Sequence, residues 1–167
     1  MYALTGSFDR KGANWVLDTH RVNRVEDYHA HVSAEQRGKA LGLAERPLGP
    51  ASNGVISVPS LCDSLLGRSA YKVRGLVSFG LAPQTSNVNP QRLHAALQEL
   101  EFYVHCDLFE TPACKYADIL LPACSLAERE ALRVGFDISS EAVEHIQIRP
   151  RLVSPRGESK PDYQVVM

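Results

Sequence analysis

A loop between two apolar runs carries the residue types of a ligand site. Asp107 directly follows the run 102–106, and Thr111 and Asp118 precede the run 119–122. Short apolar runs with polar or proline boundaries are typical of buried parallel strands, whose carboxyl ends bind ligands in α/β sheets. A carboxylate at such an end accepts hydrogen bonds from ribose hydroxyls, or from the N1–H and exocyclic amine of guanine. Asp107 is therefore a candidate binding residue; the alternative is that it caps the turn after the strand.

A second candidate site is the loop of residues 80–87. Its glycine allows close approach of the backbone, and its polar side chains suit a phosphate or ribose ahead of a helix that begins near residue 89. On these residues alone, an ordinary strand-to-helix turn is the favoured interpretation. The candidate binding residues here are Gly80, Pro83, Thr85, Ser86 and Asn87.

Thr111 and Asp118 have a plainer explanation as well. Thr111 precedes Pro112, the pattern of a helix N-cap followed by proline at the first helical position, so a capping role is favoured for it. Asp118 fits either a local cap or a supporting role behind the site. The only metal-like spacing is His29-x-His31, which needs an extended backbone and has no evident third ligand, so no metal site is predicted.

The apolar pattern predicts an α/β fold with a mostly parallel sheet. Strands are expected at 73–79, 102–106 and 118–121. A helix is expected from Pro90 to about residue 100, capped by Asn89, with apolar residues at i, i+3, i+4 and i+7. The alternating run 145–149 is expected to form an edge strand that ends at a proline.

The domain organisation follows from these elements. Residues 1–70 are predicted to be an irregular connecting segment with short helices at 34–43 and 60–66. Residues 71–167 are predicted to be a partial Rossmann-like nucleotide-binding domain. Both ends of the chain interrupt expected helices, so we expect an internal segment of a longer protein, incomplete at both ends. Its isolated form should expose apolar surface where other domains pack.

Composition excludes several classes of protein. A net charge of −1 supplies no basic surface for nucleic acid, and no apolar run approaches the length needed to insert into a membrane. The four cysteines include no Cys-x-x-Cys pair, so neither a zinc ribbon nor an iron–sulfur motif is present. No secretory signal is visible, which favours a cytoplasmic location, or a periplasmic one if a signal lies upstream.

The loop after residue 106 resembles a motif of the molybdopterin oxidoreductases of the dimethyl sulfoxide reductase family. Residues 4–14 are similar to that family's L-T-G-N-x-D-x-x-G-G-N segment, and residues 80–86 lie where it has G-x-N-P-x-x-S. The three matches occur in the family's order. The matching positions of the loop are Asp107, Phe109, Thr111, Tyr116, Ala117, Asp118, Leu121, Pro122 and Glu128.

The resemblance implies part of a molybdopterin guanine dinucleotide site, with the loop 80–87 against the guanine dinucleotide and Asp107 as a ligand residue. Two departures stand out. Ala82 replaces the usual asparagine, which removes one polar contact, and Ala131 begins an altered continuation after Glu130. The charged run 128–130 is otherwise typical of a solvated helix face or a salt-bridged loop.

The resemblance therefore identifies the chain as a segment of a molybdenum or tungsten bis-molybdopterin-guanine-dinucleotide oxidoreductase. The family's iron–sulfur cysteines, metal ligand and β-barrel have no counterpart here, so an iron–sulfur cluster is expected only outside this segment. The expected partners are the remaining domains of the parent chain and an iron–sulfur electron-transfer subunit. Two alternatives stay open: a catalytically silent scaffold of the same fold, as in the large iron–sulfur subunit of respiratory complex I, and a free-standing nucleotide-binding module.

Overall fold

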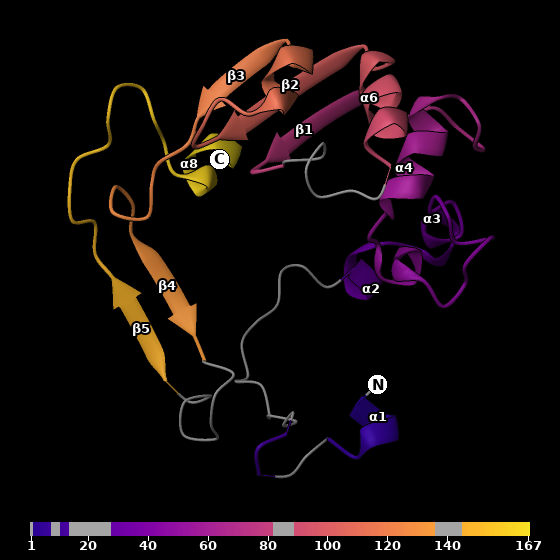
Figure 1. Ribbon diagram of the computed structural model, residues 1–167, viewed down its shortest axis with the longest axis horizontal. Helices are drawn as coiled ribbons and strands as arrows, with labels where there is room; N and C mark the ends of the chain where they lie inside the picture. Colours follow the sequence, from indigo (N-terminus) through magenta and orange to yellow (C-terminus); the bar gives the residue numbers. More distant parts are fainter. Residues whose placement is uncertain (1, 8–10, 14–27, 82–88, 136–144) are drawn as a thin grey trace. The chain divides into compact units, whose positions relative to one another are not determined.

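The chain packs as two units, each of which is described by itself. They are seen in a computed structural model (Figure 1), which describes residues 2–7, 11–13, 28–81, 89–135 and 145–167. The larger unit comprises Val25–Ser125 and Pro155–Met167, and the smaller one Met1–Arg24 and Leu126–Ser154. The boundary near residue 70 stays a prediction.

A three-stranded parallel sheet is the centre of the larger unit. Its strands are β1 (Gly75–Phe79), β2 (Phe102–Asp107) and β3 (Ile119–Pro122), in the order β1-β2-β3. Helix α6 (Pro90–Gln98) connects β1 to β2, and the short 3-10 helix η2 (Pro112–Tyr116) connects β2 to β3. The predicted α/β class and parallel sheet are confirmed.

Helix α6 begins as its sequence predicts. The Asn89 side chain accepts a hydrogen bond from the backbone N–H of Arg92 at 3.0 Å, and Pro90 occupies the first turn, where no N–H donor is needed. Leu93, Ala96 and Leu97 are buried on one face. That apolar face fixes how the crossover helix packs.

The core lies between α6 and α4 (Val58–Leu65), which pack against each other beside the sheet (Figure 1). Leu65 and Ala96 are fully buried, and Leu76 of β1 packs against the same cluster. The hydroxyl of Ser64 donates to the carbonyl of Tyr71 at 2.7 Å and accepts from the N–H of Val73 at 2.9 Å. These bonds join α4 to the chain that enters β1.

The two faces of the sheet differ. Leu76 pairs with Tyr103, and Ser78 pairs with His105. Because side chains alternate along a strand, these four lie on one face, the face on which Leu76 packs against the core cluster. The opposite face carries apolar side chains that are exposed. These are Val77, Phe79, Phe102 and Ile119.

The remaining elements of the larger unit are short. The predicted helix at 34–43 is present only as α3 (Ala34–Arg37), because turns follow its C-cap Gly38. Beside it lie α2 (Tyr28–His31) and the 3-10 helix η1 (Pro50–Asn53). The predicted start of a helix in the tail is confirmed as α8 (Asp162–Val166), after Lys160 pairs with Ala123 beyond β3.

The smaller unit contains helix α1 (Tyr2–Thr5) and an antiparallel pair, β4 (Ala131–Val134) and β5 (Ile146–Arg149). The predicted edge strand at 145–149 is thus confirmed. Its partner β4 was not predicted, because four residues after a charged run carry too little pattern. Among the residues that the structure describes, no helix is both long and apolar enough to span a bilayer.

Candidate functional site

The carboxyl ends of the three strands lie together at one end of the sheet, which we call its carboxyl edge. Gly80, directly after β1, has a positive φ of 61° and donates its N–H to the carbonyl of Cys106 at 2.9 Å. Open space surrounds the position of a side chain there. The backbone turns away immediately beside the end of β2, where Asp107 lies, so the structure brings these two candidate residues to the same edge.

A cavity of about 230 Å³ opens at this edge. Asp107 and His105 supply its strand-derived polar groups, and Phe109 is 77% exposed beside them. Its other walls come from the loop after β2, from η2 and from β3. They are Leu108, Glu110, Cys114, Leu120, Leu121 and Pro122.

The carboxylate of Asp107 is held on two sides. Its Oδ1 accepts the backbone N–H of Leu108 at 2.6 Å, and its Oδ2 lies 3.5 Å from Nε2 of His105. The side chain is 15% exposed. Asp107 therefore makes the local turn contact that the sequence offered as an alternative and also lines the cavity.

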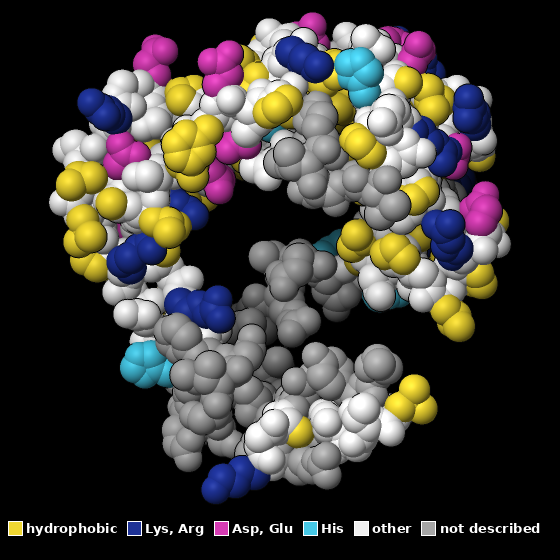
Figure 2. Space-filling view, in the orientation of Figure 1, with side chains coloured by type: hydrophobic (Ala, Val, Ile, Leu, Met, Phe, Trp, Pro, Cys, Tyr) yellow, Lys and Arg dark blue, Asp and Glu magenta, His cyan; other side chains and the backbone are white. Residues whose placement is uncertain are grey.

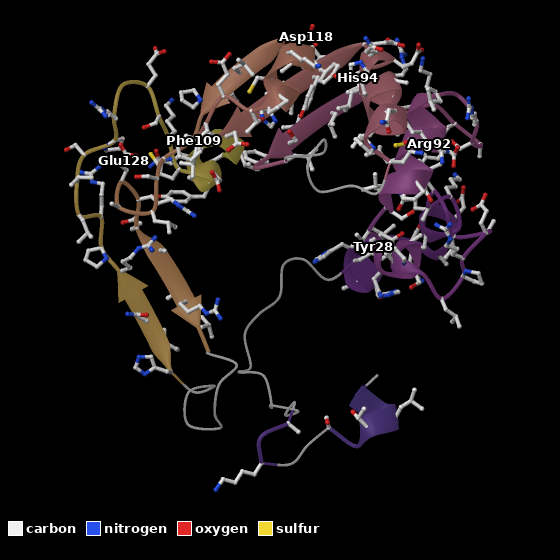
Figure 3. The ribbon with its side chains drawn as sticks, in the orientation of Figure 1. Tyr28, Arg92, His94, Phe109, Asp118 and Glu128 are labelled. Atoms are coloured by element: carbon white, nitrogen blue, oxygen red, sulfur yellow. The ribbon has the colours of Figure 1, made fainter. Side chains whose placement is uncertain are left out.

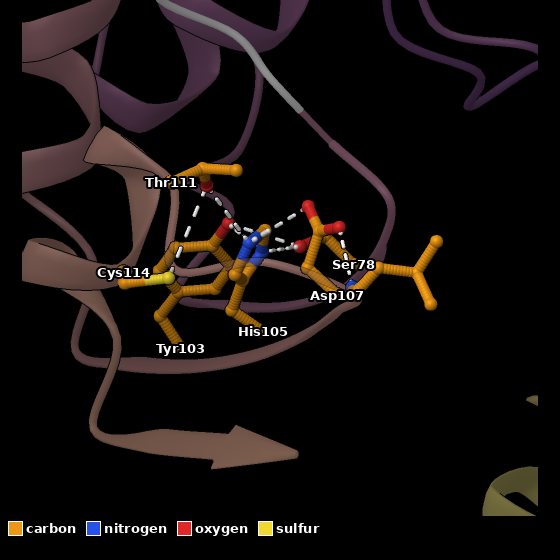
Figure 4. Close-up of polar contacts among 7 residues, drawn as sticks. Ser78, Tyr103, His105, Asp107, Thr111 and Cys114 are labelled. Carbon is orange, nitrogen blue, oxygen red and sulfur yellow. Dashed lines mark hydrogen bonds and ion pairs between the residues drawn. The ribbon is translucent and has the colours of Figure 1, made fainter. Parts of the chain in front are cut away.

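A buried polar network stands behind Asp107 (Figure 4). Nδ1 of His105 lies 2.8 Å from the hydroxyl of Ser78 and 3.0 Å from that of Tyr103, and those two hydroxyls are 2.9 Å apart. Burial raises the pKa of Tyr103 above its usual value, so the phenol keeps its proton.

The side chains of Ser78, His105 and Asp107 are of the types found in hydrolytic triads, but their arrangement is not hydrolytic. Ser78 is only 6% exposed and does not line the cavity, so its hydroxyl cannot reach a substrate. Its proton is shared with a tyrosine as well as a histidine. The network supports the site rather than supplying a nucleophile.

The preferred role of Thr111 is corrected by the structure. Thr111 occupies the N-cap of η2, but its side chain makes no capping bond. Its Oγ1 lies instead 3.3 Å from Nε2 of His105 and 3.9 Å from Sγ of Cys114. Thr111 and Asp107 thus meet at the same histidine nitrogen.

Asp118 lies at the opposite edge of the sheet from Asp107. Its Oδ2 accepts the N–H of Tyr103 at 2.7 Å, and its own N–H donates to the carbonyl of Tyr103 at 2.8 Å, which joins the start of β2 to β3. Figure 3 shows Asp118 at the amino ends of the strands and Phe109 at the arrowheads. This side-chain bond joins residues 15 positions apart in the sequence, so it is not the local cap that the sequence offered for Asp118. The other candidate residues, Pro83, Thr85, Ser86 and Asn87, lie outside the described residues.

Two residues at the site were not named as binding residues from the sequence, although Phe109 is one of the positions that match the family's loop motif. His105 lies two positions before Asp107, so strand alternation places both on one face, and this spacing could have identified it. Phe109 follows the strand as an exposed aromatic residue, a type that often contacts ligands.

Among the described residues that line the cavity, Asp107 and Glu110 carry carboxylates, and none is Lys or Arg. The wider surface carries charges of both signs. In the face that Figure 2 shows, Lys and Arg side chains are interspersed with Asp and Glu. Burial raises the pKa of the Cys106 thiol, and the carboxylates of Asp162 and Asp107 act in the same direction. Among the described residues, no group of three or more His, Cys, Asp or Glu side chains could hold a metal ion, so His29 and His31, on helix α2, do not belong to such a group.

A parallel α/β sheet with a carboxylate and a glycine turn at the carboxyl ends of its strands has the arrangement at which open α/β sheets bind ligands. The model of the molybdopterin oxidoreductase family matches residues 1–167. The chain therefore belongs to the molybdopterin oxidoreductases, as the resemblance to the dimethyl sulfoxide reductase family implied.

Individual relatives agree with this assignment. The assimilatory nitrate reductase catalytic subunit of Bacillus subtilis is 31% identical over 98% of this chain, which spans 22% of that protein. Trimethylamine-N-oxide reductase of Vibrio vulnificus is 34% identical over 54% of this chain, which spans 11% of it. The fold is shared with acetylene hydratase from Pelobacter acetylenicus, with a TM-score of 0.70 and 19% identity over 83% of this chain and 22% of that chain. This chain thus spans less than a quarter of each of these proteins.

Proposed function

We propose that this chain is a segment of a molybdenum or tungsten oxidoreductase and holds the guanine end of one of two molybdopterin guanine dinucleotides. The observation that carries the proposal is the carboxylate of Asp107, which lines a cavity at the carboxyl edge of the sheet. Gly80 turns the backbone beside it and leaves space for a ligand.

The chemistry of Asp107 suits guanine. Guanine presents its N1–H and its exocyclic amine side by side, and a carboxylate accepts both because its oxygens are acceptors only. The bond from Leu108 occupies one lone pair of Oδ1, which leaves acceptor capacity on both oxygens. Adenine presents an acceptor at N1 and would be disfavoured.

The cavity suits one end of the cofactor. Its volume of about 230 Å³ is below the roughly 300–1,000 Å³ of pockets that enclose a drug-sized ligand. It has room for a base rather than a whole dinucleotide. The exposed ring of Phe109 supplies an apolar face on which a purine can stack.

The parent protein would transfer electrons and an oxygen atom or a hydride at the metal, which the bound cofactor supplies. The residues of this chain would bind and orient the nucleotide end. We propose as partners the remaining domains of the parent chain and an iron–sulfur electron-transfer subunit, with any cluster outside this segment. The cytoplasm is the favoured location, and the periplasm the alternative.

The cofactor content of the purified parent protein tests this function. Acid hydrolysis should release guanosine monophosphate (GMP), together with molybdenum or tungsten detected by mass spectrometry. Release of a cytidine nucleotide would contradict the guanine form. A protein that contains no pterin would indicate the silent scaffold instead.

A further inference from the structure

His105 is almost completely buried and has polar groups at both ring nitrogens. It is 1% exposed, and the hydroxyls of Ser78 and Tyr103 both lie at Nδ1. At Nε2 lie the carboxylate of Asp107 and the hydroxyl of Thr111, at 3.5 and 3.3 Å. In the described part of the chain, His105 is the residue that contacts both Asp107, at the end of β2, and Thr111, in the loop after it.

The partners determine which nitrogen carries the proton. A carboxylate only accepts, so an unprotonated Nε2 would place a lone pair against the charge of Asp107. With the proton on Nε2, Nδ1 becomes an acceptor for one hydroxyl, and the second hydroxyl donates to the first. Every proton in the cluster of Ser78, Tyr103 and His105 then has an acceptor.

We propose that His105, in its Nε2–H form, is a positioning residue that directs the side chains of Asp107 and Thr111 toward the cavity. Ser78 and Tyr103 hold the ring from behind (Figure 4). In front, Nε2–H donates a hydrogen bond to the hydroxyl of Thr111 and attracts the carboxylate of Asp107, 3.5 Å away, by its partial charge. Orientation by a buried partner behind the contact residue is how binding groups keep their geometry. The inference rests on the proposed function only in the role given to Asp107 as the nucleotide contact.

The protonation state of the ring is tested on the 167-residue chain without any ligand. Nitrogen-15 NMR of the imidazole at neutral pH should show a protonated Nε2 and an unprotonated Nδ1 for His105. Any other state, including a ring that exchanges between tautomers, overturns the proposal. This measurement needs no variant, so it decides the question even if substitutions unfold the chain.

Two substitutions then test the restraint. His105→Gln keeps an N–H near the Nε2 position, whereas His105→Leu keeps only the volume. The Leu108 amide reports the orientation of Asp107, because it donates to Oδ1. Its solvent exchange, measured by NMR, should rise roughly two- to tenfold in His105→Leu, the effect of weakening one hydrogen bond. It should stay within about twofold of wild type in His105→Gln.

The amide of Gly80 is the internal control, because its bond to the carbonyl of Cys106 lies at the same edge and does not involve His105. Its exchange should be equal in all three proteins. Leu108 exchange that is unchanged in His105→Leu, or that rises together with Gly80 exchange, contradicts a specific positioning role. If wild type binds no GMP, the proposed function is contradicted instead, and the exchange data still decide the role of His105.

Discussion

The substitution Asp107→Asn exchanges one acceptor oxygen at the cavity for an amide donor. In wild type the backbone N–H of Leu108 donates to Oδ1 of Asp107 at 2.6 Å. The one oxygen of the asparagine should therefore take the Oδ1 position and keep this bond. The new NH2 group then occupies the place of Oδ2 beside Nε2 of His105, so the proposed Nε2–H of His105 is left with the hydroxyl of Thr111 as its acceptor. A guanine bound there would face a donor where it needs an acceptor.

The size of the effect follows from the burial of Asp107. Its side chain is 15% exposed, so its bonds to a ligand are largely shielded from solvent. A hydrogen bond to a charged group contributes about 1.5–3 kcal/mol. Loss of one such bond should therefore weaken GMP binding by roughly 10- to 100-fold.

The assay is a calorimetric or NMR titration of the 167-residue chain with the monophosphates of guanosine, adenosine and xanthosine. Xanthine has a carbonyl in place of the exocyclic amine, so an asparagine amide can donate to it. Wild type should prefer GMP, and Asp107→Asn should shift the preference toward xanthosine monophosphate. The matched control is Glu101→Gln, which removes an equal charge at the opposite end of β2.

Equal GMP affinity in wild type and Asp107→Asn would refute the reasoning. The same would hold if Glu101→Gln weakened binding as much, since the effect would then come from net charge. Glu101 is exposed and pairs with Arg74 at 2.6 Å, and this contact lowers its carboxyl pKa. An exposed pair of this kind contributes little to stability, so the control variant should fold normally.

Three further predictions concern the same unit. Phe109→Ala should weaken GMP binding by about 1 kcal/mol, because stacking on the ring is lost. It should leave the free energy of unfolding in urea unchanged, because the ring is 77% exposed, and a loss of stability would contradict this. Leu65→Ala should lower the free energy of unfolding by about 2–5 kcal/mol in urea titrations, because the side chain is fully buried, and a loss below this range would contradict the packing of α4 on α6. A thiol reagent should label Cys114 before Cys62 and Cys106, because the thiols of Cys62 and Cys106 are buried and have raised pKa values. Mass spectrometry measures the order of labelling, and faster labelling of either buried thiol would contradict it.

Much of the central sheet could be predicted because its signals are local. Asn89 and Pro90 mark the start of α6 by their own backbone chemistry, and the apolar run 102–106 marks β2 by its composition. A residue directly after a parallel strand must lie at the carboxyl edge. The position of Asp107 therefore followed from the position of its strand.

The roles of single side chains could not be predicted in the same way, because they depend on residues far apart in the sequence. Thr111 has the local pattern of a cap, but His105 lies within reach across the turn. Asp118 shares a loop with Asp107, yet η2 carries the chain back to the amino edge of the sheet. Strand β4 needed its partner β5 to form, and four residues alone do not show that pairing.

The most direct test of the central claim is a crystal structure of the parent protein with its cofactor bound. The account predicts that the carboxylate of Asp107 accepts hydrogen bonds from N1–H and the exocyclic amine of a guanine, at about 2.7–2.9 Å. A cofactor without a nucleotide, or a guanine bound away from the carboxyl ends of β1 and β2, would contradict it.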